Sequence, residues 1–171
     1  MRLLPILFMT FAGVANAAPA LTDLQAGVFC SQAAEGRIDA PDTTIGYIYD
    51  PVGLPHIRWV QTSVPAAIGV AFGIRARAAE EGFPVTVTVS HPPFPGHNTT
   101  EEVWSGNFNS SGDSSSSFSF DYQFELVPGD WRITIVASET GKVLLDKPFT
   151  VVPPERHPHI VKACAPDNAI S

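Results

Sequence analysis

The residues Phe118 to Val136 read FSFDYQFELVPGDWRITIV, and this stretch decides the predicted fold. Aromatic and aliphatic side chains alternate with polar ones from Phe118 to Leu126, and again from Trp131 to Ile135. A period of two places the apolar side chains on one face of a strand. Val127-Pro128-Gly129-Asp130 fits a tight turn, because Pro fixes φ and Gly accepts positive φ. The stretch therefore predicts two antiparallel strands joined by a turn.

Strands of the same kind recur along the rest of the chain, separated by Gly and Pro turns at intervals of about ten residues. Strands with one apolar face need a second apolar layer, and because no long helical pattern is present, that layer is expected to be another sheet. The sequence therefore predicts an all-β sandwich or barrel. The further expected strands are Leu24–Cys30, Ile45–Tyr49, His56–Gln61, Val70–Arg77, Val85–Ser90, Glu101–Phe108 and Val143–Val152.

Several segments between these strands are expected to be irregular. Ser31–Pro41 is polar and rich in turn residues, and Asn109–Ser117 has the composition of a flexible loop. His91–His97 contains three prolines, which cannot donate to a ladder of β-strand hydrogen bonds. Arg75–Glu81 has helical propensity but is short and lacks an N-cap, so it is interpreted as a strand end followed by a turn. The chain after Pro153 is expected to be a tail.

The first seventeen residues have the pattern of a secretory signal peptide. Arg2 precedes the apolar run Leu3–Val14, and Ala15-Asn16-Ala17 is an A-x-A cleavage site. The run is shorter than the roughly 20 residues that span a bilayer. We therefore expect cleavage after Ala17 and a single domain covering residues 18–171. The mature protein is expected to be periplasmic or secreted and not inserted in a membrane.

The charge and the cysteine count narrow the class of protein further. The formal net charge is −7 and no basic block is present, which argues against a nucleic-acid partner. The two cysteines are Cys30 and Cys164. In an oxidising compartment, an even count most simply forms one disulfide, here between the first strand and the C-terminal tail. Two separate thiols are the alternative.

A set of short strings along the chain resembles a known family. In order, they are GVFC at 27–30, TIGYI at 44–48, RWVQTSVPAAIGVAFGI at 58–74, VTVSHPP at 87–93, FDYQFELVPGDW at 120–131 and FTVVPP at 149–154. Their order and spacing resemble a family of small exported proteobacterial proteins known only as a domain of unknown function. The resemblance covers nearly all of the chain after residue 17, and it implies no catalytic residue, substrate or cofactor.

The turn within 126–131, L-x-P-G-x-W, is also similar to the turn before a late strand in immunoglobulin-like domains. This analogy concerns the fold and implies no function. Together with the strand pattern it predicts an immunoglobulin-like antiparallel β-sandwich of about 7–9 strands.

Two kinds of chemistry remain as alternatives to a binding role. Imidazoles suit zinc or copper, so a histidine-based zinc or copper protein is the first alternative. The only methionines, Met1 and Met9, fall within the predicted signal peptide and offer no thioether ligand. An enzyme of an unrecognised type is the second alternative, although the G-x-S-x-G, H-E-x-x-H and C-x-x-C motifs are absent. We expect no catalytic residue, cofactor or metal. The histidines are His56, His91, His97, His157 and His159.

A binding role remains by elimination, and one loop is the candidate site. His91–His97 is stiffened by prolines and carries Phe94 between two histidines, and Trp104 follows shortly after. A rigid loop loses little entropy on binding, and aromatic anchors supply much of the energy of an interface. The candidate binding residues are therefore His91, Phe94, His97 and Trp104. The sequence leaves open whether Phe94 and Trp104 point outward or into the core, where we expect Trp59 and Trp131. The partner is expected to be an unidentified protein or an envelope component.

Overall fold

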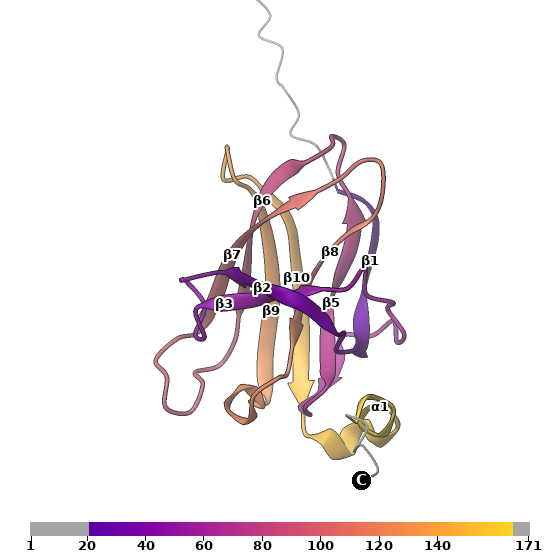
Figure 1. Ribbon diagram of the computed structural model, residues 1–171. Helices are drawn as coiled ribbons and strands as arrows, with labels where there is room; N and C mark the ends of the chain where they lie inside the picture. Colours follow the sequence, from indigo (N-terminus) through magenta and orange to yellow (C-terminus); the bar gives the residue numbers. More distant parts are fainter. Residues whose placement is uncertain (1–20, 166–171) are drawn as a thin grey trace, which may run out of the picture.

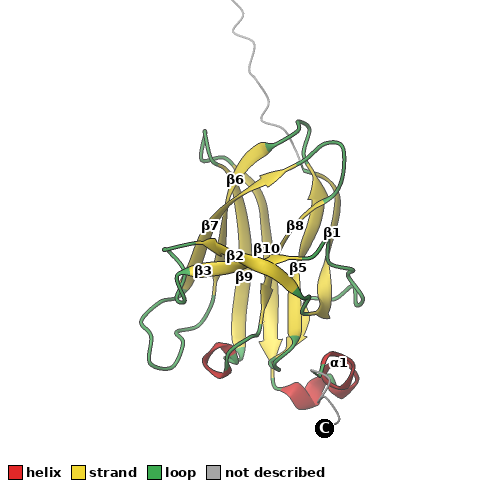
Figure 2. Ribbon diagram, viewed as in Figure 1, coloured by secondary structure: helices red, strands yellow, loops and turns green. Residues whose placement is uncertain are grey.

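The computed structural model describes residues 21–165, and eight of its ten strands form two sheets packed face to face (Figures 1 and 2). The predicted all-β sandwich is thus confirmed. The three-stranded sheet has the order β1-β5-β8, with β1 at Thr22–Cys30, β5 at Val70–Arg77 and β8 at Ser114–Ser119. The five-stranded sheet has the order β4-β10-β9-β6-β7, with β4 at Ser63–Pro65, β10 at Val143–Val152, β9 at Gly129–Ala137, β6 at Phe83–Ser90 and β7 at Glu101–Phe108.

An aromatic cluster forms the centre of the core between the two sheets. Phe72 on β5 is fully buried, and its ring centroid lies 4.9 Å from that of Phe149, 5.7 Å from that of Trp131 and 5.9 Å from that of Phe120. Trp131 is buried as the sequence predicts. Trp59 is only half-buried and packs against the margin of the core, so its assignment to the interior is correct in part.

The stretch Phe118–Val136 contributes to both sheets and does not form one hairpin. β8 belongs to the three-stranded sheet and β9 to the five-stranded sheet, so the two strands lie in opposite layers (Figure 1). Gly129 opens β9 with a φ of +146°, a conformation that favours glycine and agrees with the predicted turn. The predicted hairpin is therefore wrong in its pairing, although β9 covers its second strand.

A short 3-10 helix, η1 (Gln123–Glu125), replaces the second half of the predicted first strand. The Glu125 carboxylate accepts hydrogen bonds from the backbone N–H of Asp121 at 2.7 Å and of Tyr122 at 2.8 Å. These bonds satisfy amides that lie beyond the end of β8, and they close the turn. The alternation of Tyr122 and Phe124 with polar neighbours therefore belongs to a turn that packs one side against the sandwich.

β8 lies where the sequence predicts the flexible loop Asn109–Ser117. Ser114 and Ser116 point into the sandwich and are buried, whereas Ser115 and Ser117 are half-buried. Serine gives no hydrophobic contrast between the two faces of a strand, so the period of two is invisible in the sequence. The loop prediction is wrong for this reason.

A two-stranded hairpin crosses the outside of the sandwich (Figure 1). β2 (Ala34–Asp39) pairs antiparallel with β3 (Tyr47–Pro51), and we call residues 34–51, including the connecting loop, the strap. The strap reaches β7, where the carbonyl of Asp42 accepts the N–H of Val103 at 3.1 Å. The predicted loop Ser31–Pro41 is wrong over β2, because every residue of β2 is exposed and no alternation of apolar and polar residues marks it.

Three smaller expectations also need correction. His56–Gln61 forms only an isolated bridge, between Trp59 and Val28, and no strand. The C-terminal tail contains the 3-10 helix η2 (Pro154–Arg156) and the α-helix α1 (Pro158–Cys164). β4 pairs parallel with β10, in contrast to the other, antiparallel pairs in the described chain.

The predicted disulfide joins Cys30 at the end of β1 to Cys164 at the end of α1, with the two Cα atoms 4.9 Å apart. Ile160 on the same helix is fully buried. The disulfide and this side chain hold α1 against the end of the sandwich. Among residues 21–165, no helix is long and apolar enough to cross a bilayer. The predicted signal peptide, residues 1–17, lies outside the described residues.

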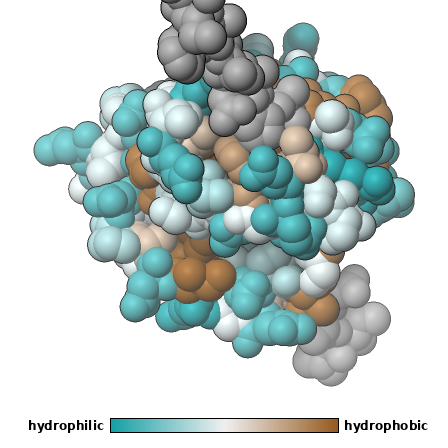
Figure 3. Space-filling model, turned by 90° about the horizontal axis from the view of Figure 1, so that it is seen from above, coloured by the Kyte–Doolittle hydropathy of each residue, from teal (hydrophilic) through white to brown (hydrophobic). Residues whose placement is uncertain are grey.

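The end of the sandwich seen from above in Figure 1 is mainly hydrophilic where it is coloured (Figure 3). Apolar side chains appear on this face in separate small areas between polar ones. A broad hydrophobic docking area is therefore not visible in this view. The hollow described next lies on the side of the sandwich that the strap crosses.

Candidate functional site

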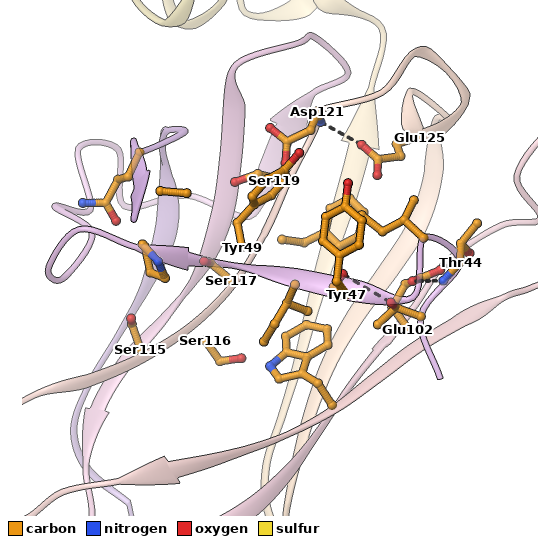
Figure 4. A pocket seen from close by; sticks show the side chains of 18 of the residues that line it. Thr44, Tyr47, Tyr49, Glu102, Ser115, Ser116, Ser117, Ser119, Asp121 and Glu125 are labelled. Atoms are coloured by element: carbon orange, nitrogen blue, oxygen red, sulfur yellow. Dashed lines mark hydrogen bonds between the residues drawn. The ribbon is translucent and has the colours of Figure 1, made fainter. Parts of the chain in front are cut away.

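A pocket of about 380 Å³ lies beneath the strap (Figure 4). This volume lies within the range of about 300–1,000 Å³ that is typical of small-molecule sites. The strap lines it with Thr44, Tyr47 and Ile48, β8 with Ser115–Ser119, β7 with Glu102 and Trp104, the turn after β8 with Asp121 and Glu125, and β1 with Phe29. The strap thus turns an open side of the sandwich into a concave site.

Glu125 is a buried carboxyl in the wall of this pocket. It is 5% exposed, and burial raises its pKa to about 7, although the backbone N–H groups of Tyr122 and Asp121 act in the opposite direction. Repulsion from the carboxylates of Asp121 and Glu102 raises the pKa of Glu125 further. Both backbone bonds fall on Oε2, and Oε1 has no hydrogen-bond partner within residues 21–165. One carboxyl oxygen is therefore free to meet a ligand.

All three tyrosines of the chain meet at one side of the pocket. The Tyr122 hydroxyl lies 2.8 Å from that of Tyr47 and 3.2 Å from that of Tyr49. Tyr47 and Tyr49 are two residues apart on β3, so both project from one face of the strap. Hydrogen bonds to Tyr47 and Tyr49 raise the pKa of Tyr122, and the bond to Tyr122 lowers the pKa of Tyr47. The cluster ties the strap to the turn that holds Glu125.

Glu102 fastens the loop of the strap to β7. It is 4% exposed and accepts hydrogen bonds from the Thr44 N–H at 2.6 Å and from the Thr44 hydroxyl (Figure 4). His91 Nε2 lies 3.4 Å from Glu102 Oε1. Burial raises the pKa of Glu102, but the nearby His91 and the bonds from Thr44 outweigh burial and hold it below its ordinary value. Glu102 is therefore an ionised anchor of the pocket roof.

β8 presents its unpaired edge and one unpaired hydroxyl to the pocket. Phe120 donates its N–H to the carbonyl of Val70 at 2.9 Å, and hydrogen-bonded residues alternate along an antiparallel pair. The odd-numbered serines of β8 therefore direct their backbone groups away from β5. Ser116 is 6% exposed, and its buried Oγ has no hydrogen-bond partner. A buried unpaired hydroxyl costs about 1–3 kcal/mol, which a suitable ligand atom would offset.

The predicted binding loop His91–His97 folds mainly inward. Phe94 is 2% exposed and stacks on the buried His91, with the ring centroids 3.8 Å apart. His97 is exposed, and Trp104 is half-buried in the pocket wall. The sequence leaves open where Phe94 and Trp104 point, and the structure places Phe94 in the core and Trp104 half-buried at its margin. Of the four candidate residues, only Trp104 lines the pocket.

The histidines lend no support to the metal-binding alternative. Within residues 21–165, no three His, Cys, Asp or Glu side chains come together as metal ligands. His157 Nε2 lies 2.7 Å from Ser63 Oγ, and the ring centroids of His157 and His159 are 6.1 Å apart. Burial and the neighbouring His159 and Arg156 lower the pKa of His157.

Of the residues that line the pocket, only Trp104 is among the binding residues that the sequence predicts. Asp121 and Glu125 occupy the polar positions of a regular alternation, where an exposed strand face is expected. The feature of the sequence that points to this pocket is the pair Tyr47 and Tyr49, two residues apart, together with the third tyrosine, Tyr122. Aromatic side chains on the polar face of a short strand indicate that this face is covered.

Replacing Glu125 with glutamine is expected to stabilise the protein at pH 8. The folded-state pKa is raised from 4.5 to about 7, so the contribution of Glu125 to stability is present below about pH 4.5 and is lost as the pH rises through 7. The amide oxygen of glutamine still accepts both N–H bonds. The expected gain at pH 8 is about 1–3 kcal/mol. Urea unfolding of both forms at pH 5.5 and pH 8 measures it, and an identical pH dependence in the two forms would contradict the prediction.

The chain matches a known family of sequences over most of its length. The model of the family described as "Domain of unknown function (DUF3859)" matches residues 17–151, which is more than half of the chain. The chain belongs to this family. The resemblance seen in the sequence is thus confirmed, and the matched part of the DUF3859 chain includes every residue that lines the pocket.

The fold of the DUF3859 chain is also found in a solved structure. The crystal structure of an immunoglobulin-like protein from Pseudomonas aeruginosa is similar, with a TM-score of 0.57 and 20% sequence identity, over 81% of this chain and 99% of that chain. At this identity the likeness shows the fold alone, and it confirms the predicted immunoglobulin-like sandwich. No curated protein matches the DUF3859 sequence.

Proposed function

We propose that this DUF3859 protein is an exported, non-catalytic binding module whose ligand site is the pocket beneath the strap. One observation carries the proposal. The wall of this pocket holds two polar atoms without a hydrogen-bond partner within residues 21–165, Ser116 Oγ and Glu125 Oε1. Concave sites with a few convergent polar groups are typical of ligand binding.

Export is supported by the N-terminal pattern together with the disulfide. Arg2, the apolar run Leu3–Val14 and the A-x-A site at 15–17 have the order of a signal peptide, and disulfides persist in oxidising compartments. The proposed mature chain begins at Ala18 and forms one β-sandwich domain in the periplasm or outside the cell. Its ligand there is an envelope component or part of an exported protein.

A binding role is favoured over catalysis by the kinds of group present. Ser63 and His157 are hydrogen-bonded at 2.7 Å, but neither residue lines the pocket. No carboxylate in the described chain bonds to His157 to orient it, as a nucleophile–base pair requires. The pocket instead combines hydroxyls, carboxyls and apolar side chains, which are groups that orient a ligand.

A fragment screen of mixed charge, read by 1H–15N NMR, tests the binding function. Fragments that bind are expected to shift the amides of Tyr47, Ser117 and Glu125. Ser117→Phe fills the pocket from its floor and is expected to abolish these shifts. Ser105→Phe, on the exposed face of β7 outside the pocket, is the matched control and is expected to keep them. No pocket shift with any fragment, or unchanged shifts in Ser117→Phe, would refute the proposed site.

A further inference from the structure

Three acidic side chains form the charged part of the pocket lining. Asp121 and Glu125 come from the turn after β8, and Glu102 comes from β7. Within residues 21–165, neither Asp121 nor Glu125 forms an ion pair. Desolvation raises the pKa of both carboxyls, although Asp121 is exposed at the surface and only Glu125 is buried. A buried carboxylate without a counter-charge is costly, and a cation supplied from outside offsets that cost.

The positive charges near this end are already engaged elsewhere. The Arg37 guanidinium lies 4.3 Å over the ring of Tyr47, on the strap. His91 approaches Glu102, which Thr44 also satisfies. The tyrosine hydroxyls bond to one another. The described part of the chain therefore brings no cation of its own to Glu125.

An independent observation points to a ligand in the same pocket. Ser116 comes from inside β8 and is unrelated to the acidic turn, yet its buried Oγ also lacks a partner. The ionised Glu125 Oε1 is an acceptor, and Ser116 Oγ can accept as well as donate a hydrogen bond, so a ligand that carries N–H donors suits both atoms. The rest of the lining includes the apolar side chains of Phe29, Ile48 and Trp104.

We propose, on the basis of the binding function above, that this pocket selects ligands with a protonated amine on an apolar body. The ammonium group meets the carboxyls of Glu125 and Asp121, with the ring of Tyr47 beside it for a cation–π contact. The apolar body lies against Ile48 and Trp104. A primary amine matches the site because it is a compact cation with three donors and no acceptor.

Binding of the amine is linked to the protonation of Glu125. Simple alkylamines stay charged well above neutral pH, as lysine does, so only the protein titrates between pH 6 and pH 8. The carboxylates that act on Glu125 are Asp121 on its own turn and Glu102 on β7, and the linked hydroxyls of Tyr47, Tyr49 and Tyr122 lie between the strap and this turn. Because the ionised carboxylate is the form that binds, the affinity is expected to rise up to about tenfold from pH 6 to pH 8.

Three probes with one skeleton test the proposal: 2-phenylethylamine, 2-phenylethanol and 3-phenylpropanoate. The amine is expected to shift the pocket amides with an affinity at least tenfold higher than the alcohol, and the carboxylate is expected not to bind there. Glu125→Gln and Asp121→Asn are each expected to weaken amine binding at least fivefold and to leave alcohol binding unchanged. In Glu125→Gln the rise in affinity between pH 6 and pH 8 is expected to disappear.

The control variant is Glu101→Gln, which removes one negative charge from an exposed position on β7 and is expected to bind the amine like the wild type. Equal affinity for the three probes would overturn the preference for amines while leaving the binding function intact. Calcium chloride that shifts the same amides where the amine does not would overturn it in favour of a metal ion. No pocket shift with any probe or fragment would overturn both proposals.

Discussion

Reduction of the Cys30–Cys164 disulfide is expected to lower the free energy of unfolding by about 4–5 kcal/mol. The two cysteines are 134 positions apart, so the bond closes a loop that contains nearly all of the described chain. A loop of this length strongly restricts the unfolded chain in the entropic account of disulfides. The loss is comparable with the whole stability of many domains, about 5–15 kcal/mol. Guanidinium unfolding with and without a reductant measures it.

The double variant Cys30→Ser/Cys164→Ser separates the bond from side effects of the reductant. It is expected to match the reduced wild type and to be insensitive to reductant. Reduction is also expected to release α1, so that proteolysis near Lys162 becomes faster. A loss of less than about 1 kcal/mol, with both thiols open to alkylation, would contradict the expected role of the bond.

Replacing Phe72 with alanine is expected to cost about 3–5 kcal/mol of unfolding free energy. Phe72 is fully buried, and its ring contacts aromatic side chains from both sheets, including Phe118 on β8 and Trp131 on β9. The variant loses the transfer free energy of the ring and leaves a cavity that neighbouring rings fill only in part. Urea unfolding followed by tryptophan fluorescence measures the change.

Two further variants calibrate that result. Phe72→Leu keeps most of the buried volume and is expected to cost clearly less than Phe72→Ala. Val143→Ala, at a residue that is 56% exposed, is expected to stay within about 0.5 kcal/mol of the wild type. A similar cost for Phe72→Ala and Val143→Ala would show that the core is not centred on Phe72.

The strands that the sequence predicts well are those with one buried and one accessible face. On β6, Val85, Val87 and Val89 are buried and the threonines between them are not, so the pattern in the sequence matches the environment. β2 is exposed throughout and β8 is mostly serine, so neither strand shows such a contrast. Pairing is a further difficulty, because β8 and β9 are neighbours in sequence but their partners are distant.

The pocket could not be predicted because the sequence pattern does not indicate that its key side chains are buried. Glu125 alternates with Phe124 and Leu126 and therefore looks like the solvent face of a strand. Its burial arises from the turn at η1 and from the strap, which lies more than seventy positions away in the sequence. Only the three-dimensional arrangement brings Tyr47 to Tyr122.

The strap has a consequence for how this molecule behaves toward its own copies. β7 and β8 are the outer strands of the two sheets, and unpaired outer strands are templates for association with other chains. The strap covers this side, held by the bond from Thr44 in its connecting loop to Glu102 and by the tyrosine hydroxyls of β3. Entry to the pocket and protection from aggregation therefore depend on the same eighteen-residue segment, 34–51. A ligand that lifted the strap would also uncover the strand edges through which two molecules could join.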